Sequence, residues 1–252
     1  MQIKAAERLI VALDAPPYNP QEPDRLIETA DALRLVEELG EDVHFYKIGW
    51  PLYMAAQSEG VPILRAFRER KKKIFLDLKF GDIPETVKLL VAVAASESVD
   101  FLTLNAPLNS IQAGVEAKGG SPLKILVVTL LTSQGKGDLE QMGINMSVEE
   151  FVLARAQQAR QIGHADGVIA SGQEAAAIRE KMGKDFLIVT PGIRPAGEGH
   201  HDHKRTVTPA EAIRAGADYL VVGRPVVQAP HPREATLRIL EQMQNAFDSL
   251  RV

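Results

Sequence analysis

The sequence predicts an α/β protein that folds as a (β/α)8 TIM barrel, a single domain spanning residues 1–252. Short apolar runs recur along the chain, and they are continuous rather than alternating, as in strands that are buried on both faces. Amphipathic segments rich in Ala, Glu, Arg and Leu separate the runs, and such alternation over about 250 residues is typical of this barrel. The runs are 9–15, 43–49, 73–80, 101–107, 124–133, 167–172, 186–193 and 219–226.

Glycines and prolines mark the ends of the predicted elements. Gly40, Gly163, Gly183 and Gly216 fall just after helical patterns, where a left-handed residue favours glycine. The proline-rich stretch 15–24 is expected to be a loop, because a residue that precedes proline disfavours helix. An open doubly wound sheet is the competing architecture, but it usually has fewer strands, and no GxGxxG pattern follows the first run.

The composition limits the classes of function. The 29 basic and 33 acidic residues give a net charge of −4, which favours solubility and argues against a general nucleic-acid surface. The chain contains no cysteine, which excludes disulfides, thiolate catalysis and zinc–thiolate sites. No apolar run reaches about 18 residues and no signal-peptide pattern is present, so we expect a soluble, cytoplasmic protein that does not enter the membrane.

Polar residues stand at the predicted C-terminal ends of the strands, where barrels build their active sites. Many of them would be polar simply because a strand end meets water. Lys47 and Asp77 fit that explanation poorly, because each lies between apolar neighbours and a buried ion must be paired or neutralised. Lys79 follows two residues after Asp77 and is expected on the same side of the strand. The polar residues at these ends are Asp14, Lys47, Asp77, Lys79, Asn105, Thr132, Ser133, Ser171, Arg194 and Arg224.

The segment "GDIPETV" (81–87) leaves two interpretations of Asp82 open. A helix with Pro84 in its first turn would place Asp82 near the N-cap. The spacing equally allows a catalytic role for this carboxylate. Thr86 would by default be a residue on the surface of the helix.

The loops after the seventh and eighth runs indicate a phosphate site. Barrels frequently bind phosphate there through backbone N–H groups, and Arg194 and Arg224 supply cations for bidentate contacts. The loop 194–206 is longer than usual and contains glycine, so we expect it to close over a ligand. The stretch "HHDH" (200–203) suggests metal binding, but no further ligands follow at a fixed spacing, so we favour a solvated or phosphate-facing role.

The stretch "FLDLKFGDIPETV", with "FYKIG", "VTLLTS", "TPGIRP" and "VVGRPV", resembles the orotidine 5′-phosphate decarboxylases. The resemblance extends over nearly the whole chain, from "VALDAP" to "GRPVV". Related phosphosugar enzymes share a D-x-K-x-x-D-I core, whereas Pro84, Thr86, "PGIRP" and "GRP" are more specific. The resemblance implies a homodimeric barrel that converts orotidine 5′-monophosphate to uridine 5′-monophosphate and CO2 without a cofactor or metal, in pyrimidine synthesis.

The resemblance also implies roles for individual residues. Lys47, Asp77 and Lys79 would form a charged array, with Lys79 as the proton donor to carbon C6 of the ring. The partner subunit's Asp82 would complete the array, and Thr86 would likewise reach the neighbouring site. The implied substrate contacts are Asp14 and Lys47 at the ribose, Thr132 at the pyrimidine, Arg194, His203, Gly223 and Arg224 at the phosphate, and in addition Asp77, Ser133 and Pro191.

The chain departs from the family pattern at two positions. His203 in "DHKR" stands where the family commonly has glutamine, and a neutral histidine still donates one hydrogen bond, with a different pH dependence. Asn105 stands where many members have histidine, which we interpret as a difference between subgroups. Three alternatives remain: a magnesium-dependent 3-keto-gulonate-6-phosphate decarboxylase or hexulose-phosphate synthase, an inactive nucleotide-binding barrel, and a phosphate-binding barrel of other chemistry.

Overall fold

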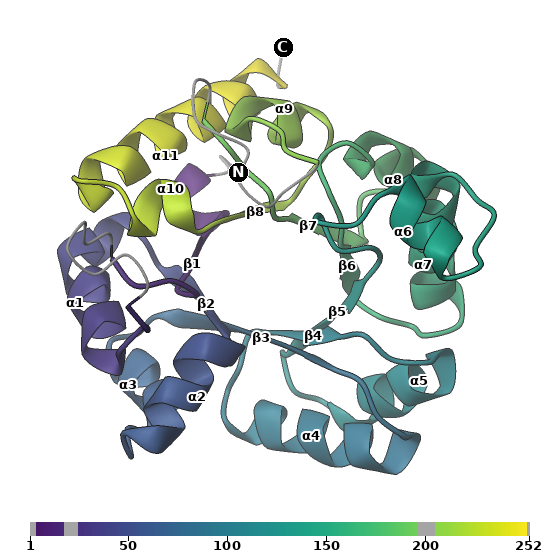
Figure 1. The fold of residues 1–252 in the computed structure, drawn as a ribbon, viewed down its shortest axis with the longest axis horizontal. Coiled ribbons are helices and arrows are strands. Elements are labelled where there is room, and N and C mark those ends of the chain that lie inside the picture. The colour runs from purple at the N-terminus through teal and green to yellow at the C-terminus, as the bar shows by residue number, and fades with distance from the viewer. Residues whose placement is uncertain (1–3, 18–24, 196–204, 251–252) are drawn as a thin grey trace.

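The computed structural model describes residues 4–17, 25–195 and 205–250. In this part of the chain, parallel strands close into a barrel in the order β1 to β8, and β8 pairs with β1. Figure 1 looks down the barrel and shows the helices around it, so the predicted (β/α)8 TIM barrel is confirmed. The strands are β1 (Leu9–Ala12), β2 (Phe45–Gly49), β3 (Lys73–Phe80), β4 (Phe101–Leu104), β5 (Lys124–Val128), β6 (Gly167–Ile169), β7 (Leu187–Thr190) and β8 (Tyr219–Val222).

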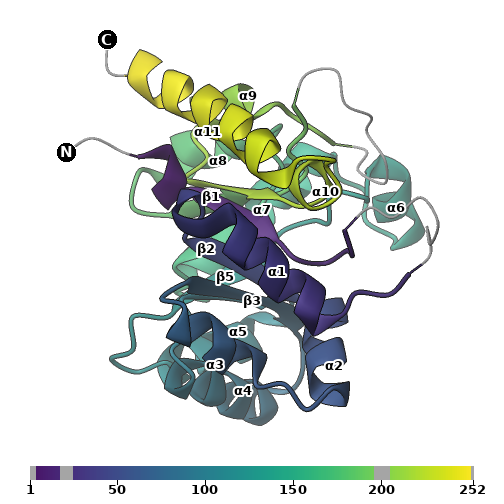
Figure 2. The same cartoon turned by 90° about the vertical axis from the view of Figure 1, so that its left-hand side faces the viewer.

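Helices connect successive strands and cover the outside of the barrel. In Figure 2, α2, α6 and α10 lie toward the right-hand side, the end at which the strands finish. The helical elements are η1 (Ala5–Glu7), α1 (Thr29–Leu39), η2 (Gly40–Asp42), α2 (Trp50–Ser58), α3 (Ile63–Glu69), α4 (Pro84–Ser96), α5 (Leu108–Ala117), α6 (Lys136–Gln141), α7 (Val148–Gln161), α8 (Ala175–Met182), α9 (Pro209–Arg214), α10 (Arg224–Val227) and α11 (Pro232–Ser249). No helix in these ranges is long and apolar enough to cross a membrane.

Most strands end earlier than the apolar runs predict. The fifth run was expected to extend to residue 133, but β5 ends at Val128, and the run 219–226 passes into the short helix α10. Apolar residues beyond the strands, such as Leu130 and Val226, are still buried in the apolar core, although Leu131 is exposed. Thr132 and Arg224 therefore lie beyond the strands rather than on them.

One of the four predicted helix-ending glycines has another explanation. Gly40, Gly183 and Gly216 have positive φ, as expected. Gly163 does not, and the left-handed residue there is His164, with φ 52°. A Cβ at position 163 would lie 2.8 Å from Ile111 Cγ2 and 2.9 Å from the Ala159 carbonyl oxygen. Close packing of α7 on α5, rather than the backbone angle, therefore requires this glycine.

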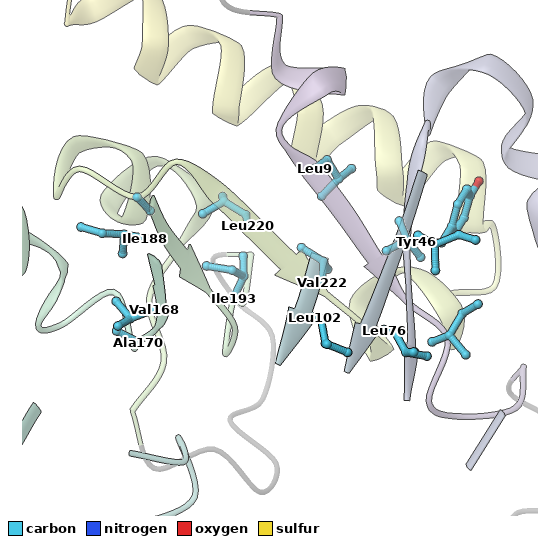
Figure 3. Packing of buried hydrophobic residues seen from close by; sticks show 14 of the residues in the cluster. Leu9, Tyr46, Leu76, Leu102, Val168, Ala170, Ile188, Ile193, Leu220 and Val222 are labelled. Atoms are coloured by element: carbon cyan, nitrogen blue, oxygen red, sulfur yellow. The ribbon is translucent and has the colours of Figure 1, made fainter. Parts of the chain in front are cut away.

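Alternate side chains of the strands form two apolar layers. One layer faces the helices, and Figure 3 shows part of it, with Leu76, Leu102 and Leu220 among the labelled residues. The other layer fills the barrel and includes Phe101, whose ring lies edge-on to Phe45 at 4.9 Å and to Tyr219 at 5.0 Å between centroids. These three residues lie at the starts of β4, β2 and β8, so aromatic rings occupy the N-terminal half of the barrel.

Aspartates join neighbouring strands at this N-terminal end. Each is the residue immediately before a strand, and each accepts the backbone N–H of a residue near the start of the preceding strand. These interactions supply acceptors for N–H groups at the edge of the barrel. The pairs are Asp100 with Ile74 at 2.9 Å, Asp166 with Ile125 at 2.8 Å, and Asp218 with Ile188 at 2.8 Å.

Candidate active site

A cavity of about 340 Å³ lies at the C-terminal end of the barrel. Seven of the residues singled out from the sequence line it: Asp14, Lys47, Asp77, Lys79, Thr132, Ser133 and Pro191. Sequence reasoning missed the apolar part of the lining, because a side chain of the barrel core carries no polar signal. Apolar walls limit the water around the charges and so strengthen their interactions. The apolar residues are Phe75, Val128, Leu130, Leu131, Ile169 and Val221.

Asp77 is the centre of a charged array in this cavity. Its Oδ2 lies 2.9 Å from Lys79 Nζ and 3.1 Å from Lys47 Nζ. Lys47 also forms an ion pair and hydrogen bond with Asp14. Strands β2 and β3 are adjacent, with Gly49 opposite Asp77 in the register. The structure therefore brings Lys47 and Asp77 together across two strands, as the sequence predicts.

Mutual pairing keeps the buried ions charged. Burial by itself raises the pKa of Asp77, but Lys47, Lys79 and the hydrogen bonds from Lys79 and Thr103 outweigh it, so this pKa lies below its ordinary value. Burial by itself lowers the pKa of Lys47, but Asp77 and Asp14 outweigh it and raise this pKa above its ordinary value. A carboxylate and an ammonium group therefore persist side by side at neutral pH.

Lys79 has an unusual backbone conformation. Its φ of 49° lies in the left-handed region, which costs a residue other than glycine about 1–3 kcal/mol and is concentrated at functional sites. The pairing of β3 with β4 shifts register between Leu76 and Phe80, which marks a β-bulge. Asp77 and Lys79 thus share a side, as predicted, but the strand between them is not regular.

Gly49 is a site residue that sequence reasoning did not single out. A Cβ at this position would lie 2.3 Å from Asp14 Oδ1 and 3.3 Å from Lys47 Nζ. Only glycine leaves room for the pair between Asp14 and Lys47. The available signal was the glycine two residues after the lysine in "FYKIG". Asn105 is exposed, and its backbone N–H donates to the Phe80 carbonyl oxygen at 2.9 Å.

Asp82 and Thr86 do not line the cavity of their own chain within the described residues. Asp82 is exposed, and its Oδ1 accepts the N–H of Ile83 at 2.7 Å. The N-cap of α4 is Ile83, so the interpretation of Asp82 as the helix cap is wrong. Thr86 is half-buried in the first turn of α4, near the exposed Ile83 and Leu89.

Three of the residues expected at the phosphate, Arg194, Gly223 and Arg224, follow the ends of β7 and β8. Arg194 is buried, its backbone N–H donates to the Val207 carbonyl oxygen at 2.9 Å, and its Nη1 donates to the Ile193 carbonyl oxygen at 2.7 Å. Gly223 precedes α10, which begins at the half-buried Arg224. His203 and the rest of "HHDH" lie outside the described residues. Inside them, no group of three or more His, Cys, Asp or Glu side chains is arranged for a metal ion.

A (β/α)8 barrel with a Lys–Asp–Lys array at its C-terminal end, in which Lys47 and Asp77 are buried, defines the class, a barrel enzyme that can stabilise negative charge and transfer protons. The chain belongs to the orotidine 5′-phosphate decarboxylase / HUMPS family, whose model matches residues 7–239.

Relatives that match nearly the whole chain bear the decarboxylase name. The orotidine 5′-phosphate decarboxylase of Nitrobacter winogradskyi is 44% identical over 96% of this chain and 95% of its own length. The one from Bradyrhizobium diazoefficiens is 45% identical over 92% of each chain. The crystal structure of orotidine 5′-phosphate decarboxylase from Lactobacillus acidophilus superposes with a TM-score of 0.75 at 32% identity, covering 94% of this chain and 98% of the other.

Proposed function

We propose that this protein decarboxylates orotidine 5′-monophosphate to uridine 5′-monophosphate and CO2 in pyrimidine synthesis, and that residues 1–252 act as one catalytic domain. The observation that carries the proposal is the ion-paired array of Lys47, Asp77 and Lys79 at the barrel mouth, in a chain 44% identical to a relative bearing that name.

The chemistry requires charge stabilisation and a proton. Loss of CO2 from the pyrimidine leaves a carbanion at C6, which has no adjacent carbonyl placed as an electron sink. Lys79 lines the cavity as an ammonium group, so it can lie beside the developing negative charge and then donate a proton to C6. The product is uridine 5′-monophosphate, with the bond between C6 and the carboxyl carbon replaced by a C6–H bond.

Asp77 and Lys47 support Lys79. The Asp77 carboxylate orients the Lys79 ammonium group through the 2.9 Å contact. We place the carboxylate of the bound substrate beside the carboxylate of Asp77. The repulsion between these two groups is relieved when CO2 leaves as a neutral molecule. Lys47 forms a second ion pair with Asp77, so that each buried ion of the array has an oppositely charged partner.

We assign the remaining residues to the substrate from the family resemblance and, for those that line the cavity, also from their places in its wall. Phosphate lies far from C6, so its binding raises the rate only if it helps to close and assemble the site. The assigned contacts are Asp14 and Lys47 to the ribose, Thr132 and Ser133 near the pyrimidine, Pro191 along the cavity wall, and Arg194, His203, Gly223 and Arg224 to the phosphate.

The proposal includes a homodimer in which the partner subunit's Asp82 and the partner subunit's Thr86 complete each site. Asp82 is exposed and does not line its own chain's cavity, within the described residues. Beside it, α4 and its N-cap expose Ile83, Leu89 and Val93, each of which has 62–70% of its surface accessible to solvent. Large exposed apolar side chains gathered on one helix are typical of an interface.

An assay of purified protein tests the reaction directly. We expect orotidine 5′-monophosphate absorbance to fall with equal rates in the presence and absence of EDTA, and Lys79→Ala protein to provide the background. Activity lost on adding EDTA would instead favour the magnesium-dependent phosphosugar enzymes. No absorbance change in either condition would overturn the proposed reaction.

Mixed dimers test the shared site. Lys79→Ala and Asp82→Ala proteins should each be inactive, and subunit exchange between them should restore activity, because a mixed dimer contains one site with both native residues. Random exchange should reactivate about a quarter of all sites. The control is exchange between two preparations of Lys79→Ala. If exchange is demonstrated by differently tagged subunits and activity stays at zero, Asp82 does not act across the interface.

A further inference from the structure

The hydroxyl of Thr103 contacts two groups of the charged array, although the function proposed above gives it no task. Thr103 lies on β4 and is fully buried, with 0% of its surface exposed. Its Oγ1 donates a hydrogen bond to Asp77 Oδ1 and accepts one from the Lys79 backbone N–H, each at 2.9 Å. One hydroxyl therefore donates a hydrogen bond to one residue of the array and accepts a hydrogen bond from another.

Thr103 stands opposite the β-bulge that contains Lys79. Leu76 pairs with Leu102 and Phe80 pairs with Leu104, so residues 77–79 of β3 face the single residue 103 of β4. A strand that bulges in this way loses regular ladder hydrogen bonds. The Lys79 N–H donates to the threonine side chain where a regular strand would offer a carbonyl oxygen. The hydroxyl thus holds the residue whose φ is 49°.

The same hydroxyl fixes the orientation of the Asp77 carboxylate. Oδ2 lies between Lys79 Nζ and Lys47 Nζ, at 2.9 and 3.1 Å. Thr103 is the hydrogen-bond donor to the other oxygen, Oδ1. Contacts on both oxygens define the plane of the carboxylate, so removal of the hydroxyl removes one of the two constraints on rotation about the last side-chain bond of Asp77.

We propose that Thr103 is a positioning residue for the decarboxylation, which holds Lys79 in its left-handed backbone conformation and orients Asp77 so that the Lys79 ammonium group lies at C6. This inference rests on the proposed function. If the Thr103 hydroxyl only completed buried hydrogen bonds, its removal would change folding stability and not the chemical step. A positioning residue affects the chemical step, because a small displacement of the proton donor lowers the rate while substrate binding elsewhere is unchanged.

The test compares Thr103→Val, which keeps the shape but removes the hydroxyl, with Thr103→Ser, which keeps the hydroxyl. We expect Thr103→Val to lower kcat by about 10- to 100-fold with KM for orotidine 5′-monophosphate changed less than about threefold. Thr103→Ser should retain at least about half of the native kcat. The matched control is Thr236→Val on α11, a fully buried threonine whose hydroxyl donates to the Pro232 carbonyl oxygen at 2.9 Å; its kcat should equal that of the native protein.

Three results would overturn the inference: native kcat in folded Thr103→Val, a loss that Thr103→Ser shares in full, or a rise in KM with kcat unchanged. If Thr103→Val does not fold, Thr103→Cys provides the same comparison, because a thiol fills similar space and hydrogen-bonds weakly. Absence of decarboxylation in the native protein would reject the proposed function itself. Native activity together with an equally active Thr103→Val protein would reject only the role of Thr103.

Discussion

Asp77 at the C-terminal end of the barrel and Asp166 at the N-terminal end are each held by two lysines. The lysines of Asp166 are Lys118, the C-cap of α5, and Lys124, which begins β5. Asp166 Oδ2 also accepts the backbone N–H of Ile125 at 2.8 Å. Asp166 therefore provides an acceptor for a backbone N–H group at the start of β5, and Lys118 and Lys124 balance its charge.

The contacts of Asp77 are of another kind. Its partners among the described residues are the side chains of Lys47, Lys79 and Thr103. Both lysines belong to strands and line the cavity, so their remaining N–H groups are available to a ligand. The same residue types thus build a structural cluster before one strand and a cluster that lines the cavity within another. The two differ in the position of the aspartate relative to its strand and in whether the lysines line the cavity.

The largest effect that separates the two clusters should come from their lysines. Lys79→Ala should lower kcat by at least about 10⁴-fold, since it removes the proposed proton donor together with its positive charge. Binding of uridine 5′-monophosphate, measured by titration calorimetry, should remain detectable. Lys118→Ala should keep kcat within about twofold and lower stability by up to about 1 kcal/mol. Comparable turnover in the two variants would remove the distinction.

Arginines at opposite ends of β8 extend the comparison. Arg224→Ala should lower kcat/KM by about 10- to 100-fold and weaken nucleotide binding, because charge-assisted hydrogen bonds to phosphate are lost. Arg8 lies at the other end, with its guanidinium carbon 4.8 Å from the centroid of the Tyr219 ring. Arg8→Ala should leave kcat/KM unchanged. An unchanged kcat/KM in Arg224→Ala would reject its assignment to the phosphate.

Removing Asp166 should affect folding and not chemistry. Asp166→Ala leaves the Ile125 N–H and the Lys118 ammonium group without their acceptor, so the free energy of unfolding should fall by about 1–3 kcal/mol. Asp166→Asn keeps an acceptor oxygen and should lose less. Urea unfolding followed by circular dichroism measures both, and kcat measured well below the transition should match the native value. A kcat that falls with native stability would contradict this division.

The sequence predicted the fold and the centre of the site for the same physical reason. Buried parallel strands are continuously apolar, so the ions Lys47 and Asp77 stand out within them, and only pairing makes their burial acceptable. The strand ends were placed too late because buried residues such as Leu130 continue the apolar pattern beyond the hydrogen-bonded ladder.

Other parts of the site leave no such signal in one chain. A threonine in a strand, such as Thr103, is an ordinary β residue until the bulge opposite it is known. The roles proposed for Asp82 and Thr86 depend on a second copy of the chain. In the sequence, the aspartates at the N-terminal end of the barrel (Asp100, Asp166 and Asp218) differ from Asp77 only in that each comes immediately before a strand. The stretches "SVDFL" and "GADYL" contain two of these aspartates, Asp100 and Asp218. Their structural role can be inferred only when the first residue of each strand is known.

Asp77 and Asp100 should respond to pH in opposite directions. The folded-state pKa of Asp77 lies below its ordinary value of 3.8, so its stabilising contribution is present above pH 3.8 and is lost as the pH falls through the folded pKa. Burial raises the pKa of Asp100, and the Ile74 N–H and Lys73 reduce that rise only in part. The ionised form of Asp100 therefore lowers stability at neutral pH, and protonation relieves this as the pH falls through its raised pKa.

The smallest predicted effect follows from that contrast. Asp100→Asn keeps an acceptor for the Ile74 N–H and removes the buried charge, so at neutral pH the variant should be as stable as the native protein or more stable by up to about 1 kcal/mol. Urea unfolding at a series of pH values from about 7 down to about 4 tests the sign, because the native protein should gain on the variant as Asp100 is protonated. If the native protein instead loses stability relative to Asp100→Asn over this range, the charge of Asp100 stabilises the folded protein, as that of Asp77 does, and the predicted contrast is wrong.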